Sequence, residues 1–138
     1  MIHQHIFELD SLILCGEVTN FDFDVEVTTD DPTNRLYQVS YVGNTSQLNA
    51  TENLARCELI NQRAHTPWQA YTVKKGSYHS SAVVTGCLTA TLVKSSHTVA
   101  VSATTLGDLD GDEVYVYTRE SCDPEDLVPV LEMVRDEL

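Results

Sequence analysis

Five histidines are the side chains of this sequence most able to act as bases or metal ligands: His3, His5, His65, His79 and His97. His3 and His5 are two residues apart, so in an extended segment their imidazoles would lie on one face. No Cys, Asp or Glu completes a ligand set at their spacing, and the sequence therefore predicts no metal site. A free amine at Met1 would offer one alternative, chelation of Cu²⁺ or Ni²⁺ through backbone nitrogens and His3.

Serines lie beside two of these histidines, which raises the question of nucleophilic catalysis. Ser80 and Ser81 follow His79, and Ser96 precedes His97. A serine and its base must meet in space and need an acid to orient the base, and adjacency in sequence supplies neither. The sequence therefore predicts no catalytic residue, no cofactor and no enzyme activity.

Charge is the unusual feature of the composition. The chain carries 21 acidic and 8 basic residues, a formal net charge of −13. Such a field repels nucleic acid and anionic lipid and attracts cationic proteins. We therefore expect a protein partner with a basic surface, no direct nucleic-acid binding and no membrane binding. The competing reading is a solvated acidic surface that serves only solubility.

The acidic residues are concentrated in an alternating row. In NFDFDVEVTTD (20–30), Asp22, Asp24 and Glu26 alternate with apolar residues, as in a half-buried strand with carboxylates on its wet face. A second acidic cluster lies in the C-terminal 16 residues, 123–138. The sequence DLDGD (108–112) looks like a calcium loop, but its Gly111 is fourth rather than sixth, so a β-turn is expected there.

Two hairpins are expected from the alternation of apolar residues. The first pairs 20–30 with RLYQVSYV (35–42) across a DDPTN turn, which would place Val27 opposite Tyr37 and Val25 opposite Val39. The second folds TATLVKSSHTVAVSA (89–103) at 94–97, which pairs Leu92 with Val99. A third strand, EVYVYTR (113–119), would extend the second hairpin into a meander.

Two helices complete the expected fold. Apolar residues in 49–65 recur near helical spacing, and Thr51 is a fair N-cap. In 121–138, Asp123 is the expected cap, Pro124 suits the first helical position, and Leu127, Val130, Leu131 and Val134 would form a buried stripe. With a further strand near 69–73, the prediction is a single α+β domain over 1–138: an antiparallel β-meander sheet with two helices packed on it.

The cysteines and the N-terminal sequence indicate a cytoplasmic protein. Cys15, Cys57, Cys87 and Cys122 are widely spaced, with no C-x-x-C motif, and are interpreted as four small buried residues in a reducing compartment. MIHQHIFELD has neither a basic region nor a long apolar run, so no signal peptide is expected.

Two segments of the sequence resemble the type III secretion chaperone-like superfamily. One is ENLARCELINQRAHTPWQAYTV, a predicted helix that leads into a Trp-containing strand, and the other is the ending DGDEVYVYTRESCDPEDLVPVLEMVRDEL. Together they cover about a third of the chain. The resemblance implies a small, acidic, non-enzymatic α+β protein that binds a partner protein and can form a homodimer.

These features favour a small acidic interaction protein: a chaperone, an immunity protein, or a phage-type or other mobile-element inhibitor. The expected partner-binding residues are Asp22, Asp24, Glu26, Tyr37, Tyr41 and Trp68. One alternative is a hot-dog-like dimeric enzyme acting on a small acyl substrate, with the predicted helix at 51–64 wrapped by strands. The other alternative is a virion structural protein that self-assembles.

Overall fold

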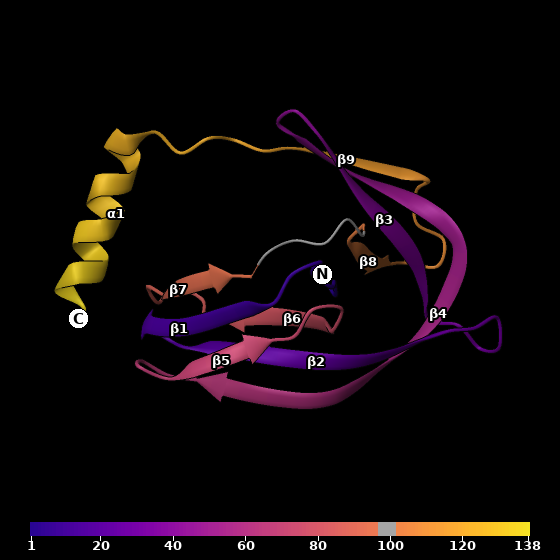
Figure 1. Ribbon diagram of the computed structural model, residues 1–138, viewed down its shortest axis with the longest axis horizontal. Coiled ribbons are helices and arrows are strands. Elements are labelled where there is room, and N and C mark those ends of the chain that lie inside the picture. Colours follow the sequence, from indigo (N-terminus) through magenta and orange to yellow (C-terminus); the bar gives the residue numbers. More distant parts are fainter. Residues whose placement is uncertain (97–101) are drawn as a thin grey trace.

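The chain folds into two antiparallel sheets and one C-terminal helix (Figure 1). The computed structural model describes residues 1–96 and 102–138. The strands are β1 (Leu9–Cys15), β2 (Val18–Val27), β3 (Asn34–Val42), β4 (Thr45–His65), β5 (Ala70–Val73), β6 (Tyr78–Val83), β7 (Ala90–Ser95), β8 (Thr104–Gly107) and β9 (Val114–Thr118), and the helix is α1 (Pro124–Asp136). The predicted α+β class with antiparallel sheet is confirmed. The predicted meander order of the strands is wrong, and so is the prediction of two helices, because the described residues form one.

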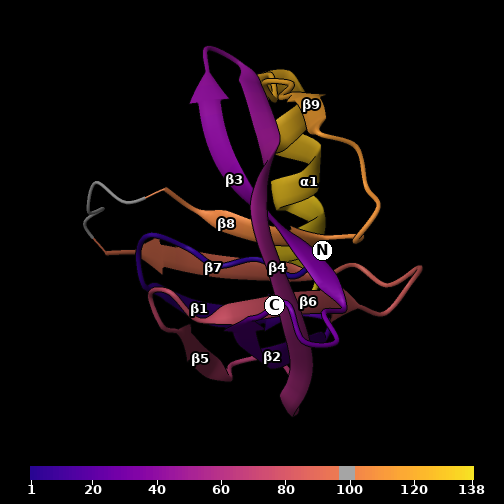
Figure 2. The ribbon, with the colours of Figure 1, turned by 90° about the vertical axis from the view of Figure 1, so that its right-hand side faces the viewer.

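The larger sheet has the strand order β6-β2-β4-β3-β8, with β9 also paired to β4. Its centre is β4, a strand of 21 residues that runs vertically through the middle of Figure 2. β3 pairs with the first half of β4, up to Ala55, and β2 pairs with the second half, from Ala55 to His65. The backbone of β4 is therefore hydrogen-bonded to different partners along its length.

The predicted helix at 49–65 is wrong, because this segment is most of β4. Its residues have good helix propensity, but propensity is a weak preference that tertiary pairing overrides. Ile60 is an extra residue at a bulge opposite Asp22 and Phe23. The hot-dog-like architecture required a helix here, so that fold is not formed.

Both predicted hairpins contain real strands with wrong partners. β2 and β3 form where alternation placed them, but each pairs with β4, so Val27 lies opposite Ala55 and Val39 opposite Leu48. β7 lies in the first arm of the second hairpin but pairs with β1 in the smaller sheet. β8 begins just after the predicted second arm and pairs with β3 in the larger sheet. Residues 97–101 of the second hairpin, including Val99, lie outside the described residues. β9 confirms the predicted third strand, but it pairs with β4.

The N-terminal residues lie between β6 and β8, the two edge strands of the larger sheet. His3 and His79 exchange backbone hydrogen bonds of 3.0 and 2.9 Å, and His3 also bridges to Thr105 of β8. The Gln4 N–H donates to the Thr104 carbonyl at 3.0 Å. This segment therefore joins the two edges of the sheet.

The apolar core lies under this junction. Leu36, Ala55 and Leu106 form its buried centre, and the partly buried residues packed against it are Ile2, Val25, Cys57 and Tyr78. The smaller sheet, ordered β5-β1-β7, contributes Ile13, which is fully buried. The His65 ring at the end of β4 stacks on Tyr71 of β5 at 4.3 Å, a contact between the two sheets.

α1 begins where predicted, with Asp123 before it and Pro124 in its first turn, but the Asp123 side chain makes no capping hydrogen bond. The predicted burial of its apolar stripe is wrong, because none of its residues is buried. Figure 1 shows α1 at the end of a long connection from β9, apart from both sheets. Within residues 1–96 and 102–138, no helix combines the length and apolar character needed to cross a bilayer.

The four cysteines are all free thiols. Cys15 is buried and Cys57 is half-buried, as expected for small core residues. Cys87 and Cys122 are exposed, so the prediction of four buried cysteines is wrong for these two.

Candidate functional site

The acidic row on β2 is only partly a free surface. Asp24 and Glu26 are exposed, and Glu26 forms an ion pair with Arg56 of β4. Asp22 is half-buried, and its two carboxylate oxygens accept hydrogen bonds from the side-chain amides of Asn20 and Asn61 at 2.8 and 2.9 Å. The row therefore leaves Asp24 and Glu26 facing solvent, whereas Asp22 belongs to a polar network within the fold.

The three predicted aromatic anchors lie in different places. Tyr41 and Trp68 are 62% and 63% exposed, but Tyr41 pairs with Ser46 at one end of β4 and Trp68 follows His65 at the other. The Arg119 guanidinium lies 5.3 Å from the centre of the Tyr41 ring. These two residues and the acidic row are thus spread along β4 and do not form one patch.

Tyr37 is a core residue, and placing it on a binding surface was wrong. Its side chain is 1% exposed, its hydroxyl donates to the Asp112 carbonyl at 3.0 Å, and burial raises the pKa of its phenol. A Cβ at Gly107 would come within 2.6 Å of the Tyr37 ring, so glycine permits this close approach. Tyr37 therefore fixes β8 and the 108–113 turn against β3.

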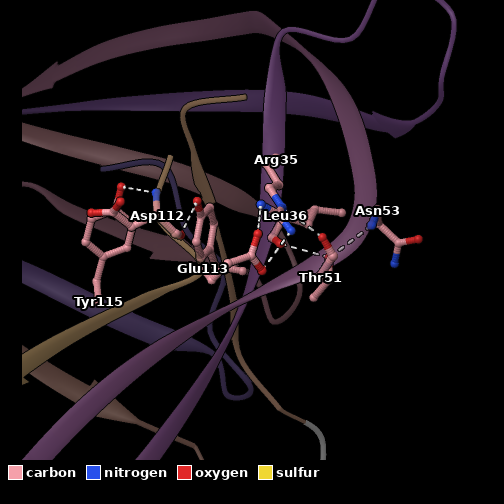
Figure 3. Close-up of polar contacts among 8 residues, drawn as sticks. Arg35, Leu36, Thr51, Asn53, Asp112, Glu113 and Tyr115 are labelled. Carbon is pink, nitrogen blue, oxygen red and sulfur yellow. Dashed lines mark hydrogen bonds and ion pairs between the residues drawn. The ribbon is translucent and has the colours of Figure 1, made fainter. Parts of the chain in front are cut away.

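Figure 3 shows a polar network that contains Arg35, Thr51 and Glu113. Arg35 donates to both carboxylate oxygens of Glu113, at 2.8 and 3.2 Å, and to the Thr51 carbonyl at 3.0 Å. The Thr51 hydroxyl donates to the Leu36 carbonyl at 2.8 Å and accepts the Asn53 N–H at 3.2 Å. The bond to Glu113 raises the pKa of Arg35. These contacts join β3, β4 and the turn before β9, which is a structural role.

The strongest concentration of chemically active side chains is a cluster of three histidines, His3, His5 and His79. Their ring centres lie 4.8 Å apart for His3 and His5, 4.6 Å for His3 and His79, and 5.1 Å for His5 and His79. One ring nitrogen from each falls within 4.8 Å of the others. His3 and His5 are half-buried, and His79 is 5% exposed.

Hydrogen bonds fix the tautomer of His79. A carboxylate only accepts, so the Asn20 amide must direct its NH₂ to Asp22 and its oxygen to the other side. That oxygen lies 3.2 Å from Nδ1 of His79, and this nitrogen must therefore carry the proton and donate. The Nε2 atom of His79 is left as an unprotonated acceptor, buried and without a hydrogen-bond partner in the described part of the chain.

The same environment keeps His79 neutral. Burial, together with smaller effects of the neighbouring His3 and His5, lowers its pKa from 6.5 to about 4, against a smaller opposing effect of Asp22. Burial and His3 also lower the pKa of His5. A neutral imidazole with an unprotonated Nε2 is the form that acts as an acceptor or metal ligand.

No serine nucleophile is assembled at this cluster. The Ser81 hydroxyl donates to Asn20 at 3.3 Å, and Nδ1 of His79 is bonded to the same oxygen. An open groove of about 510 Å³ lies nearby, between the 22–25 segment of β2 and the 72–78 segment. Carboxylates of Asp22 and Asp24 and the Lys74 side chain line it, with no histidine among the lining residues.

The cluster is not evident from the sequence, because His79 is 74 positions beyond His5. The alternation of His3 and His5 was the only signal in the sequence. The third histidine is brought to the other two by strand pairing, which spacing along the chain does not reveal.

α1 offers a second candidate site, an exposed amphipathic surface. Its apolar stripe (Leu127, Val130, Leu131 and Val134) includes three side chains that are 45%, 48% and 55% exposed, and Val134 is half-buried. Acidic residues lie on the remaining faces: Glu125, Asp126, Glu132 and Asp136. The arrangement suits insertion of a helix into an apolar groove of another protein.

Comparison with known proteins identifies no similar family or protein. No family model matches the chain, and neither a curated protein nor a solved structure matches it.

Proposed function

We propose that this chain is a small, acidic, non-enzymatic protein that binds a partner protein, which it blocks or chaperones, with α1 as the main docking element. The observation that carries the proposal is the exposure of the apolar stripe of α1. An amphipathic helix of a folded protein ordinarily buries its apolar stripe. Transfer of each such side chain out of water contributes about 1.5–3 kcal/mol, so a partner that covers the stripe gains substantial binding free energy.

The partner has an apolar groove with basic residues around it. The segment 124–138 carries five acidic residues and one basic residue, and the whole chain has a net charge of −13. Positive charge around the groove would complement the acidic faces of α1 and accelerate the encounter. Asp24 and Glu26 add a second exposed acidic surface, which steers the partner without having to touch it.

Two further features support the chaperone and inhibitor readings. The C-terminal segment that resembles type III secretion chaperones contains α1, although the other resembling segment forms β4 rather than a helix. All four cysteines are free, which supports a reducing compartment such as the cytoplasm. A homodimer formed through the apolar stripe remains a proposal, and it would occlude the surface offered to a different partner.

Parallel affinity capture tests the proposal. Wild type, the helix variant Leu127→Asp/Leu131→Asp, and the control Leu109→Asp are immobilised and exposed to the same lysate at low salt. Leu109 is 41% exposed between β8 and β9, so the control makes one substitution of the same kind away from α1.

We expect a basic protein that binds wild type and the control, is absent from the helix variant, and elutes as salt rises. Identical captured proteins on all three matrices would contradict the proposal. Sedimentation of the wild type and the helix variant over a range of concentrations then separates self-association from binding to a different protein.

A further inference from the structure

We propose that His3, His5 and His79 form a binding site for a divalent transition metal ion, and that Zn²⁺ fits it best. The site is independent of partner binding through α1. It rests on the position of three imidazoles and on one buried nitrogen that has no hydrogen-bond partner among residues 1–96 and 102–138.

The three imidazoles already surround one point. Their ligand nitrogens lie within 4.8 Å of one another. Tetrahedral Zn²⁺ with bonds of about 2.0–2.1 Å needs ligand nitrogens about 3.4 Å apart. His3 and His5 are half-buried side chains near the N-terminus of the chain, so rotation of their rings can close this difference while His79 stays in place.

The Nε2 atom of His79 is the observation that points to a ligand. Buried polar atoms nearly always have a hydrogen-bond partner, and leaving one unpaired is costly. In the described part of the chain this atom has none, although the residue is only 5% exposed. A metal ion bound by the three histidines would accept the lone pair of this nitrogen, which makes no hydrogen bond among the described residues.

The surroundings of His79 have the arrangement that metal-binding histidines require. Its Nδ1–H donates to Asn20, and the Asn20 amide is held by Asp22. Such an outer partner fixes the tautomer and the ring orientation and increases the basicity of the metal-binding nitrogen. The negative charge of Asp22 lies behind this relay and favours a cation at the site.

The donor set selects the class of ion. Three imidazole nitrogens suit Zn²⁺ and its neighbours, whereas Mg²⁺ and Ca²⁺ prefer oxygen. A water molecule would complete the tetrahedron. Chelation of Cu²⁺ or Ni²⁺ through the backbone of Met1, Ile2 and His3 conflicts with the fold, because the His3 N–H donates to the His79 carbonyl at 3.0 Å.

Binding of the metal ion would link the N-terminal segment to β6. His3 and His5 belong to the segment that joins β6 and β8, and His79 belongs to β6. The metal would therefore stabilise the junction between the two edges of the larger sheet, a structural role.

Calorimetric titration of the metal-free protein with Zn²⁺ tests the site, together with the absorption spectrum of the Co²⁺ form. The exposed thiols are first removed by Cys87→Ser and Cys122→Ser, since free cysteines bind the same ions. The test variant in this background is His3→Gln/His5→Gln. The control is Gln4→Ala, which alters the same segment at a side chain bonded to Thr104 and removes no imidazole.

We expect one Zn²⁺ per chain, a nitrogen-ligated tetrahedral Co²⁺ spectrum, and a raised unfolding temperature with Zn²⁺. The double histidine variant should lose more than about tenfold in affinity, since loss of even an outer partner costs 10–100-fold. The control should bind as the parent does. The absence of saturable binding, an unchanged affinity in the histidine variant, or an equal loss in the control would overturn the proposal.

Discussion

The side-chain oxygen of Asn20 lies 3.2 Å from Nδ1 of His79, and both side chains are buried. Because the carboxylate of Asp22 fixes the orientation of the Asn20 amide, this contact also determines which nitrogen of His79 carries the proton. One pair of residues on neighbouring strands thus connects the acidic row of β2 with the histidine cluster, through His79 of β6.

Asn20→Ala should destabilise the fold by about 1–3 kcal/mol, because it leaves the Nδ1–H of buried His79 without an acceptor. The free energy of unfolding from urea titration measures the effect. Asn53→Ala is the matched control, because Asn53 is exposed and its substitution should change stability by less than about 0.5 kcal/mol. Equal losses of unfolding free energy in the two variants would show that the Asn20–His79 hydrogen bond makes no particular contribution to stability.

The metal-free protein should lose stability as the pH falls from 6.5 to about 4, the ordinary and the folded-state pKa of His79. In this window the unfolded chain binds the proton and the folded chain does not, so acid favours unfolding. The contribution is fully present above pH 6.5, and its loss amounts to at most about 3 kcal/mol.

Urea titrations in chelator, at several pH values, measure this loss for wild type and His79→Gln. The variant should show the smaller acid destabilisation, since carboxylates elsewhere titrate equally in both proteins. His3, His5 and Asp22 face the His79 ring and remain in both. Parallel pH profiles would contradict a depressed pKa at His79.

Tyr37 and Tyr41 lie on the same strand and should respond oppositely to truncation. Tyr37→Ala should cost about 3–5 kcal/mol, because it empties a fully buried aromatic position. Tyr41→Ala should cost less than about 1 kcal/mol, because it removes only an exposed ring beside Arg119. Denaturant midpoints of the two variants decide the question, and similar midpoints would contradict the assignment of Tyr37 to the core.

Reversal of the exposed acidic row, Asp24→Lys/Glu26→Lys, should slow association with the captured partner about tenfold at low salt. The difference should disappear at high salt, because screening removes steering. The fold should persist, because the change breaks only the exposed Glu26–Arg56 pair. Stopped-flow association rates measure the effect.

Asp108→Lys/Asp110→Lys makes the same change in net charge in the turn before β9. An equal slowing by this control would assign the effect to total charge rather than to β2.

Alternation along the sequence predicted the strands β2, β3 and β9, whereas β1 was not predicted. β9 lies within its predicted segment, whereas β2 begins two residues and β3 one residue before theirs. The helix α1 begins after Asp123 as predicted, although the Asp123 side chain makes no capping hydrogen bond. The partners of these strands were not predictable in the same way. Alternation states which residues share a face, but the central strand β4 was itself mistaken for a helix, so its neighbours β2 and β3 were paired with each other.

The histidine cluster shows the same limit for a functional site. His3 and His5 could be recognised as a pair from their spacing, but His79 joins them only through strand pairing over more than seventy residues. The orienting role of Asn20 was equally invisible, because a buried asparagine within a strand has no sequence signature. The exposure of α1 also could not be foreseen, since an amphipathic helix looks the same whether its partner lies within the chain or outside it.

Backbone hydrogen exchange of α1 measures most directly whether this helix docks on a partner. In the isolated protein, the amides of 124–136 should exchange much faster than those in the core of the larger sheet, because α1 has no buried residue to hold it. Addition of the captured partner should slow exchange across the helix in the wild type. In the Leu127→Asp/Leu131→Asp variant, exchange across the helix should stay unchanged. Strong protection of α1 in the isolated monomer, or no change on adding the partner, would contradict docking through α1.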